Sequence, residues 1–198
     1  TLALTLRAHP RFSHYLSDEQ IEMLYLSAPL HDIGKVGIPD HILLKPGRLD
    51  ATEFEVMKTH TTLGYQSILS ATERLSGGSS FLTCAMEIAL SHQEKWDGSG
   101  YPQGLSGDAI PISARLMAVA DVYDALISRR VYKEGMPHEK AVAIIVEGRG
   151  THFDPDMVDA FLELQAEFAA IALRYGDTDD DLAVKAAQMD RLQAPAAP

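Results

Sequence analysis

Two adjacent residues, His31 and Asp32, are the strongest candidates for chemistry in this chain, and they lie within the run APLHDIGKVGIPD. A neutral imidazole can bind a metal ion, and a carboxylate can bind two ions because it has two oxygens. His60, His92 and Asp121 follow, each on a separate segment whose pattern predicts a helix. These nitrogen and oxygen ligands are sufficient for a two-metal hydrolytic site.

Each of these residues also has an ordinary structural explanation. His31 and Asp32 could form a polar helix end, and His60 and His92 could be histidines with satisfied hydrogen bonds. Asp121 lies in the apolar run MAVADVYDAL, where a buried lone carboxylate is costly unless it is paired or metal-bound. Asp124, three residues later, either orients a ligand or is an exposed helix residue.

Helices must position these side chains, and apolar residues recur at helical spacing along most of the chain. Ser17 with Gln20, and Thr52 with Glu55, fit the capping-box pattern and predict helix starts, the second for a helix that contains His60. Further helices are predicted at residues 81–91, 112–130, 137–146 and 155–175. No segment shows strand alternation, so we predict an all-α fold, a helical bundle with a metal centre in its interior.

Composition narrows the class of protein further. The 198 residues suffice for one substantial domain, predicted at 1–175, followed by an acidic and then Ala/Pro-rich tail at 176–198. The net charge of −11 argues against a non-specific DNA binder. The single Cys84 excludes an internal disulfide framework and fits a reducing, cytoplasmic setting. No apolar run approaches the ~20 residues of a membrane span, and TLALTLRAHPRF resembles the end of a helix that began earlier, so we expect a fragment of a longer protein.

Several motifs together resemble one known family. HDIGK, KTHTTLG, HQEKWDGSGYP, DVYDAL and RRVYK occur in this order over about residues 31–155. The chain is therefore similar to HD-GYP domains, a branch of the HD phosphohydrolase superfamily. The resemblance implies an all-helical fold of HD-domain type. It also implies hydrolysis of the bacterial second messenger cyclic di-GMP to linear pGpG, and in some members to GMP, by a metal-bridging hydroxide.

The resemblance also implies roles for individual residues. It makes metal ligands of His31, Asp32, His60, His92 and Asp121, with Asp32 bridging two ions. Lys35 would lie near the reacting phosphate, as a proton donor or as a charge, so Lys35 and Asp32 are the predicted catalytic residues. The predicted substrate-binding residues are Arg130, Lys133, Tyr101 and Arg115. The motif that names the family is Gly100-Tyr101-Pro102.

Structural alternatives remain open for the substrate-binding set. Arg130 and Lys133 could form a solvated helix end, where cations are favoured in any case. Tyr101 either stacks on guanine or supports its loop by packing, and Arg115 could be structural.

Two departures from the family pattern affect the metal centre. Members usually have two adjacent histidines where this chain has His92 and Gln93, so Gln93 is predicted as a weak ligand or as a residue that orients a ligand. A Glu and a His on an earlier helix of the family would fall before Thr1. We therefore expect two divalent ions; a ligand set without sulfur favours iron or manganese, and nickel or zinc also fit.

The predicted function is a metal-dependent cyclic di-GMP phosphodiesterase in bacterial two-component signalling. The predicted partners are an N-terminal receiver domain and, by the same resemblance, a GGDEF-domain protein. Two alternatives remain: a non-catalytic module that senses a nucleotide or binds a partner, and a hydrolase of another phosphoester such as pGpG.

Overall fold

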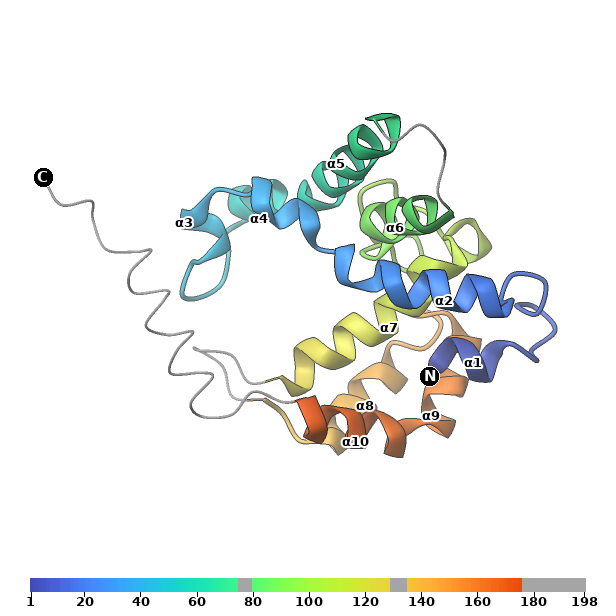
Figure 1. The fold of residues 1–198 in the computed structure, drawn as a ribbon. Helices are drawn as coiled ribbons and strands as arrows, with labels where there is room; N and C mark the ends of the chain where they lie inside the picture. The colour runs from blue at the N-terminus through green and yellow to red at the C-terminus, as the bar shows by residue number, and fades with distance from the viewer. Residues whose placement is uncertain (75–79, 129–134, 176–198) are drawn as a thin grey trace, which may run out of the picture.

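The structure is a computed structural model that describes residues 1–74, 80–128 and 135–175 (Figure 1). Within these ranges the regular structure is helical, and no strand occurs apart from a single bridge between Arg149 and Phe153. The prediction of an all-α fold is therefore confirmed. The predicted tail at 176–198 lies outside the described residues, as do Arg130 and Lys133.

Among the described connections, the longest are residues 92–106 before η3 and α7 and residues 7–17 between α1 and α2. The α-helices are α1 (Leu2–Leu6), α2 (Asp18–Ser27), α3 (Asp40–Leu43), α4 (Ala51–Lys58), α5 (His60–Arg74), α6 (Ser80–Ser91), α7 (Ile112–Ile127), α8 (His138–Glu147), α9 (Pro155–Glu163) and α10 (Gln165–Tyr175). Three short 3-10 helices accompany them, η1 (Ala28–Leu30), η2 (Ile33–Gly37) and η3 (Gly107–Ala109).

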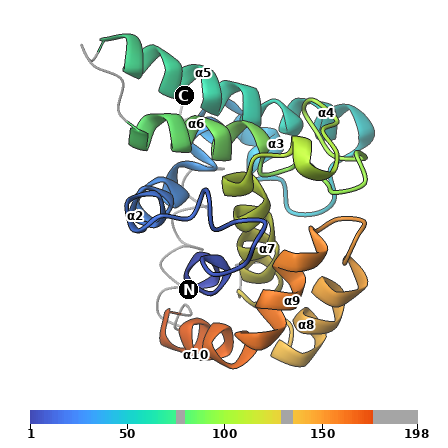
Figure 2. The same cartoon turned by 90° about the vertical axis from the view of Figure 1, so that its right-hand side faces the viewer.

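The helices are arranged around α7, which crosses the middle of the molecule (Figures 1 and 2). On one side of α7 lie α5 and α6, side by side, with α2 packed against α6; on the other side lie α8, α9 and α10, with α1 against α9. The main hydrophobic core fills the space between these groups, and its most buried large side chains include Phe12, Leu16, Val119, Met157 and Phe161. A smaller cluster joins α5 to α6.

The helix starts show how local chemistry sets these boundaries. The Ser17 hydroxyl accepts a hydrogen bond from the Gln20 backbone N–H and caps α2, as predicted. The second predicted capping box is wrong: Asp50 and Glu53 form it, not Thr52 and Glu55. Because an aspartate caps as well as a threonine does, the helix begins two residues earlier than expected.

Two predicted helices are each divided by a single residue. Thr59 separates α4 from α5, so His60 is the first residue of a helix rather than an interior one. Leu164 separates α9 from α10 within the predicted 155–175 helix. The second break allows Phe161 and Phe168 to pack edge to face, with ring centroids 4.9 Å apart. Helical periodicity continues across both breaks, which is why the sequence did not indicate them.

Candidate metal centre

The predicted ligands come together around the carboxylate of Asp32. Its Oδ1 oxygen lies 3.5 Å from Nε2 of His60 and 3.8 Å from Nε2 of His92. Its Oδ2 oxygen lies 3.2 Å from Nε2 of His31, which in turn lies 3.6 Å from Oδ1 of Asp121. The two oxygens of one carboxylate thus face two separate groups of ligands, as a carboxylate that bridges two cations would.

Two short 3-10 helices place His31 and Asp32 at this position. Pro29 lies in η1, where α2 has just ended, and Asp32 immediately precedes η2. Gly34 of η2 then packs directly against the backbone of α5: a Cβ at Gly34 would lie 1.9 Å from the His60 carbonyl oxygen and 2.4 Å from the Gly64 backbone nitrogen. Only glycine permits this approach, which brings the HDIGK segment against the helix that begins with His60.

Backbone carbonyls fix the orientation of the three imidazole rings. Nδ1 lies 2.8 Å from the Ala28 oxygen in His31, 2.7 Å from the Met57 oxygen in His60 and 3.0 Å from the Ile88 oxygen in His92. A carbonyl oxygen only accepts hydrogen bonds, so each Nδ1 must carry the proton and donate it. In the neutral rings this leaves the Nε2 lone pairs pointing at the carboxylates, ready for a metal ion.

The site is short of positive charge at its buried end. Nε2 of His60 and Nε2 of His92 lie 3.3 Å apart, although neither carries a proton in its neutral form. The neighbouring Oδ1 of Asp32 is buried and has no hydrogen-bond partner among the described residues. A buried polar atom without a hydrogen-bond partner is costly. One ligand atom from each of Asp32, His60 and His92 lies within 4.8 Å of the other two, so the residues present fit a cation at this position.

Protonation compensates part of the negative charge at the other end. Burial opposes charge on His31, but its hydrogen bonds with Asp121 and Asp32 outweigh burial and raise the pKa of the imidazole to about 10. Burial lowers the pKa of His92 to about 4, with the charges of His31 and His60 acting in the same direction. Burial also lowers the pKa of His60. A proton therefore resides on His31, and a metal ion bound there would replace it.

Lys35 and Gln93, which the sequence predicted near the ligands, each contact one of the candidate ligand carboxylates. The Lys35 ammonium lies 2.5 Å from Oδ2 of Asp32, and the Lys35 side chain is 41% exposed. Burial raises the pKa of Asp32, but the hydrogen bonds from His31 and Lys35 outweigh burial and hold that pKa well below its usual range. Gln93 donates from Nε2 to Oδ2 of Asp121 at 3.5 Å, so in this geometry it contacts a ligand as an orienting residue would.

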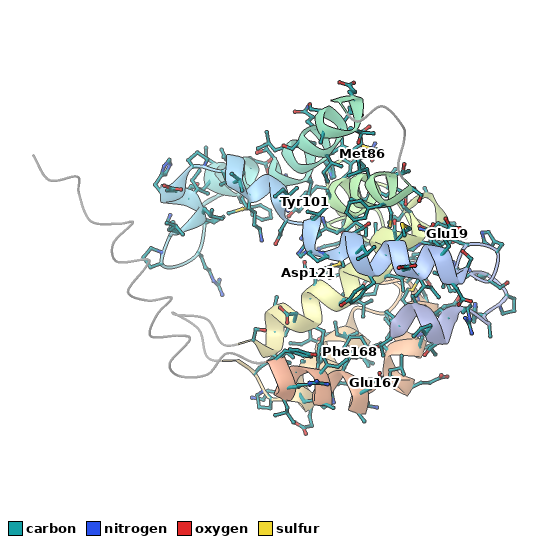
Figure 3. All side chains as sticks on the ribbon, in the orientation of Figure 1. Glu19, Met86, Tyr101, Asp121, Glu167 and Phe168 are labelled. Carbon is teal, nitrogen blue, oxygen red and sulfur yellow. The ribbon has the colours of Figure 1, made fainter. Side chains whose placement is uncertain are left out.

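The Gly-Tyr-Pro loop places an aromatic ring against the cluster. The half-buried Tyr101 ring lies edge to face with His60, with centroids 6.4 Å apart. In Figure 3, Tyr101 and Asp121 lie toward the middle of the molecule, Tyr101 near the layer of α4 to α6 and Asp121 on helix α7. Burial raises the pKa of Tyr101 to about 12, and the charges of Asp32 and Asp121 add to this effect. The phenol therefore stays protonated and can donate a hydrogen bond.

Glu94 shapes this loop, and the sequence analysis missed it. Its side chain is buried, with Oε1 accepting from the Gln103 N–H at 2.7 Å and Oε2 from the Leu105 N–H at 3.0 Å. The loop passes so close to Glu94 that a Cβ at Gly100 would lie 2.5 Å from the Glu94 Cα. The sequence did show a charged residue directly before a glycine-rich loop, which could have indicated Glu94. Its partners, however, are backbone amides, and the spacing of side chains along the sequence does not predict contacts with backbone amides.

Two further predicted residues lie elsewhere. Arg115 is not among the ligands: its side chain is 6% exposed, and its guanidinium pairs with Asp154 and Asp108, at 2.9 Å each. These contacts fit the structural alternative, and the substrate-binding role of Arg115 stays a prediction. Asp124 is exposed and accepts a hydrogen bond from the Ser128 hydroxyl at 3.1 Å, at the end of α7. It therefore corresponds to the exposed helix residue of the two predicted roles.

The fold and this site define an all-helical domain with a candidate metal centre, and comparison with known proteins identifies its family. A family model described as "HD domain" matches residues 11–157, so the chain belongs to the HD-domain family. None of the helices in the described ranges is long and apolar enough to cross a membrane.

Curated relatives carry more specific names. The chain is 60% identical, over 89% of its length, to a "Cyclic di-GMP phosphodiesterase" of Vibrio cholerae, and 48% identical, over 83%, to a protein of the same name from Thermotoga maritima. It is 47% identical, over 79%, to the "Cyclic di-GMP phosphodiesterase response regulator RpfG" of Xanthomonas campestris. The matched region spans only 36%, 43% and 40% of these three relatives, respectively.

Proposed function

We propose that this chain is a metal-dependent phosphodiesterase that hydrolyses cyclic di-GMP to linear pGpG, with GMP as a further product. The observation that carries the proposal is the position of the Asp32 carboxylate, whose two oxygens contact two different groups of ligands. Membership of the HD-domain family and the names of the relatives support the reaction class and the substrate.

Two divalent ions would be held by this ligand set. His60, His92 and Oδ1 of Asp32 would bind one ion, and His31, Asp121 and Oδ2 of Asp32 the other. Such ions, when bound, lower the pKa of a coordinated water and stabilise the charge that develops on phosphate oxygens. Iron or manganese suits these nitrogen and oxygen ligands best, and nickel or zinc also fits.

The residues around the ligands would handle the phosphodiester itself. Lys35, partly exposed and beside Asp32, is positioned to attract a phosphate oxygen or to give a proton to the leaving oxygen. Gln93 holds Asp121 in orientation through its amide. The buried His60 and His92 rings keep bulk water away from one side of the cluster. Arg130 and Lys133 remain the residues predicted to bind the dinucleotide.

The greater length of the relatives supports a proposal for the partner domains of this chain. Because one of them is named a response regulator, we infer that a receiver domain precedes this region in the full-length protein. A GGDEF-domain protein is the second inferred partner.

A direct assay tests the function. Full-length protein loaded anaerobically with iron or manganese is incubated with cyclic di-GMP, and the products are separated by chromatography. We expect linear pGpG to accumulate, and Asp32→Ala to abolish it. Product formation no faster than that of the Asp32→Ala variant, in every metal, would contradict the proposal.

Gln93 favours one alternative, a nucleotide-binding module without turnover. An amide at this position takes away an imidazole that members of the HD-GYP branch usually have. Tight calorimetric binding of cyclic di-GMP without hydrolysis in any metal would select this alternative. Hydrolysis of pGpG with no action on cyclic di-GMP would select a linear-dinucleotide hydrolase.

A further inference from the structure

Tyr101 contacts a second aromatic ring besides that of His60. Phe54 of α4 packs edge to face with Tyr101, with ring centroids 6.1 Å apart and an interplanar angle of 86°. Tyr101 makes the same kind of contact with His60. One ring therefore connects Phe54 to a ligand of the metal centre. Despite this contact, the residue Phe54 is 45% exposed.

A cation accompanies the two rings. The Lys58 ammonium lies one helical turn after Phe54, 5.7 Å from the Phe54 centroid and 5.8 Å from the Tyr101 centroid. Its partner is Glu55, at 2.7 Å. The cation lies within cation–π range of both rings and keeps the α4 side chains and the Gly-Tyr-Pro loop together. This holds the Phe54 ring in a defined position although it faces solvent.

We propose that Phe54 is a stacking surface for a purine base of the nucleotide whose phosphate lies on the metal centre. This inference deepens the proposed function and rests on it. In a nucleotide the ribose lies between the base and the phosphate. In this site the Tyr101 ring lies between Phe54 and His60 in the series of contacts, so a base on Phe54 and a phosphate at the metal centre could belong to one nucleotide. An exposed aromatic ring binds any base through its π-face, and Lys58 beside it favours a ligand with negative charge.

An isolated exposed Phe would carry no such meaning, because single apolar residues are common on protein surfaces. The distinguishing feature is the continuous series of ring contacts from Phe54 through Tyr101 to His60, with Lys58 over the first two rings.

The test compares Phe54→Leu, Phe54→Trp and wild type as full-length, manganese-loaded protein. Leucine keeps the side chain apolar but has no π-face, whereas tryptophan has a larger π-face than phenylalanine. We expect Phe54→Leu to raise KM for cyclic di-GMP about tenfold with the smaller effect on kcat, and Phe54→Trp to keep KM near or below the wild-type value. Metal content by elemental analysis, and the melting temperature, should stay unchanged, since the side chain is exposed.

Binding of a non-hydrolysable phosphorothioate analogue of cyclic di-GMP, measured by calorimetry, separates the two hypotheses. If wild type binds the analogue but does not hydrolyse cyclic di-GMP in any metal, the proposed function is refuted. A tenfold weaker affinity of Phe54→Leu for the analogue would in that case still support the stacking surface. If Phe54→Leu matches wild type in both KM and analogue affinity, or loses metal and kcat together, the stacking role is refuted. If wild type neither binds nor hydrolyses the nucleotide, both proposals fail.

Discussion

The Oδ1 oxygen of Asp32 is buried, lies 3.5 Å from Nε2 of His60, and has no hydrogen-bond partner among the described residues. The His60 ring cannot supply a proton while neutral, because its Nδ1 already donates to the Met57 carbonyl. Two electron-rich atoms thus face each other in a buried position, an arrangement that a cation between them would stabilise.

Asp32→Asn tests the bridging role directly. The amide keeps the size of the side chain but has one oxygen and no charge, so it cannot hold two cations. We expect loss of bound metal and a fall in phosphodiesterase activity of more than roughly 100-fold. Elemental analysis and product chromatography measure the two effects. Asp40→Asn, at an exposed carboxylate of α3, is the matched control and should retain both metal and activity.

The close contact of Gly34 with α5 gives a prediction for stability. In Gly34→Ala the new methyl group would lie 1.9 Å from the His60 carbonyl oxygen, so η2 must move away from α5. We expect a loss of about 2–4 kcal/mol in the free energy of unfolding, together with weaker metal binding. Denaturant unfolding of metal-free protein and a chelator-competition titration provide the measurements.

Gly64→Ala is the control for this contact. Its added Cβ would meet the Gly34 backbone nitrogen at 3.3 Å, a distance that a small adjustment accommodates. A loss in Gly64→Ala equal to that in Gly34→Ala would argue against this explanation.

Glu94→Gln should loosen the Gly-Tyr-Pro loop. The carboxylate accepts from two backbone amides, whereas a glutamine side chain has one acceptor oxygen and leaves one amide without a partner. We expect a loss of about 1–3 kcal/mol in stability. Amide exchange at Gln103 and Leu105 should become faster. The Asp97 N–H, which bonds to the Thr151 carbonyl instead, is the internal reference; equal acceleration there would indicate general loosening of the fold.

His152 makes stability depend on pH. Burial lowers the pKa of this imidazole to about 4, from an ordinary value of 6.5 in the unfolded chain. Between pH 4 and 6.5 the unfolded state binds this proton more readily than the folded state does. The free energy of unfolding therefore falls as the pH is lowered from 6.5 toward 4, whereas above pH 6.5 this group costs the folded state nothing. Urea unfolding of metal-free protein at pH 7.5 and 5 should show a smaller decrease in His152→Gln than in wild type.

The exposed His14 provides the comparison for that experiment. His14→Gln should lose as much stability between pH 7.5 and 5 as wild type does. A decrease in His152→Gln identical to that in wild type would assign the pH dependence to other groups.

The sequence by itself determined the helical class and the family pattern, and it predicted the candidate ligands that the structure brings together. Helical periodicity and motif spacing are local properties, so they could be recognised in the HDIGK run and around His60, His92 and Asp121. The cap of α2 by Ser17 belongs to the same class of local signals.

Only the tertiary structure decided how these segments meet. The division of the Asp32 oxygens between His31 and His60 depends on Gly34 packing against α5, a contact between segments distant along the chain. Helix breaks at Thr59 and Leu164, and the placement of Arg115 in an ion cluster away from the ligands, likewise result from packing. Periodicity specifies which face of a helix is apolar, but not which other element that face will contact.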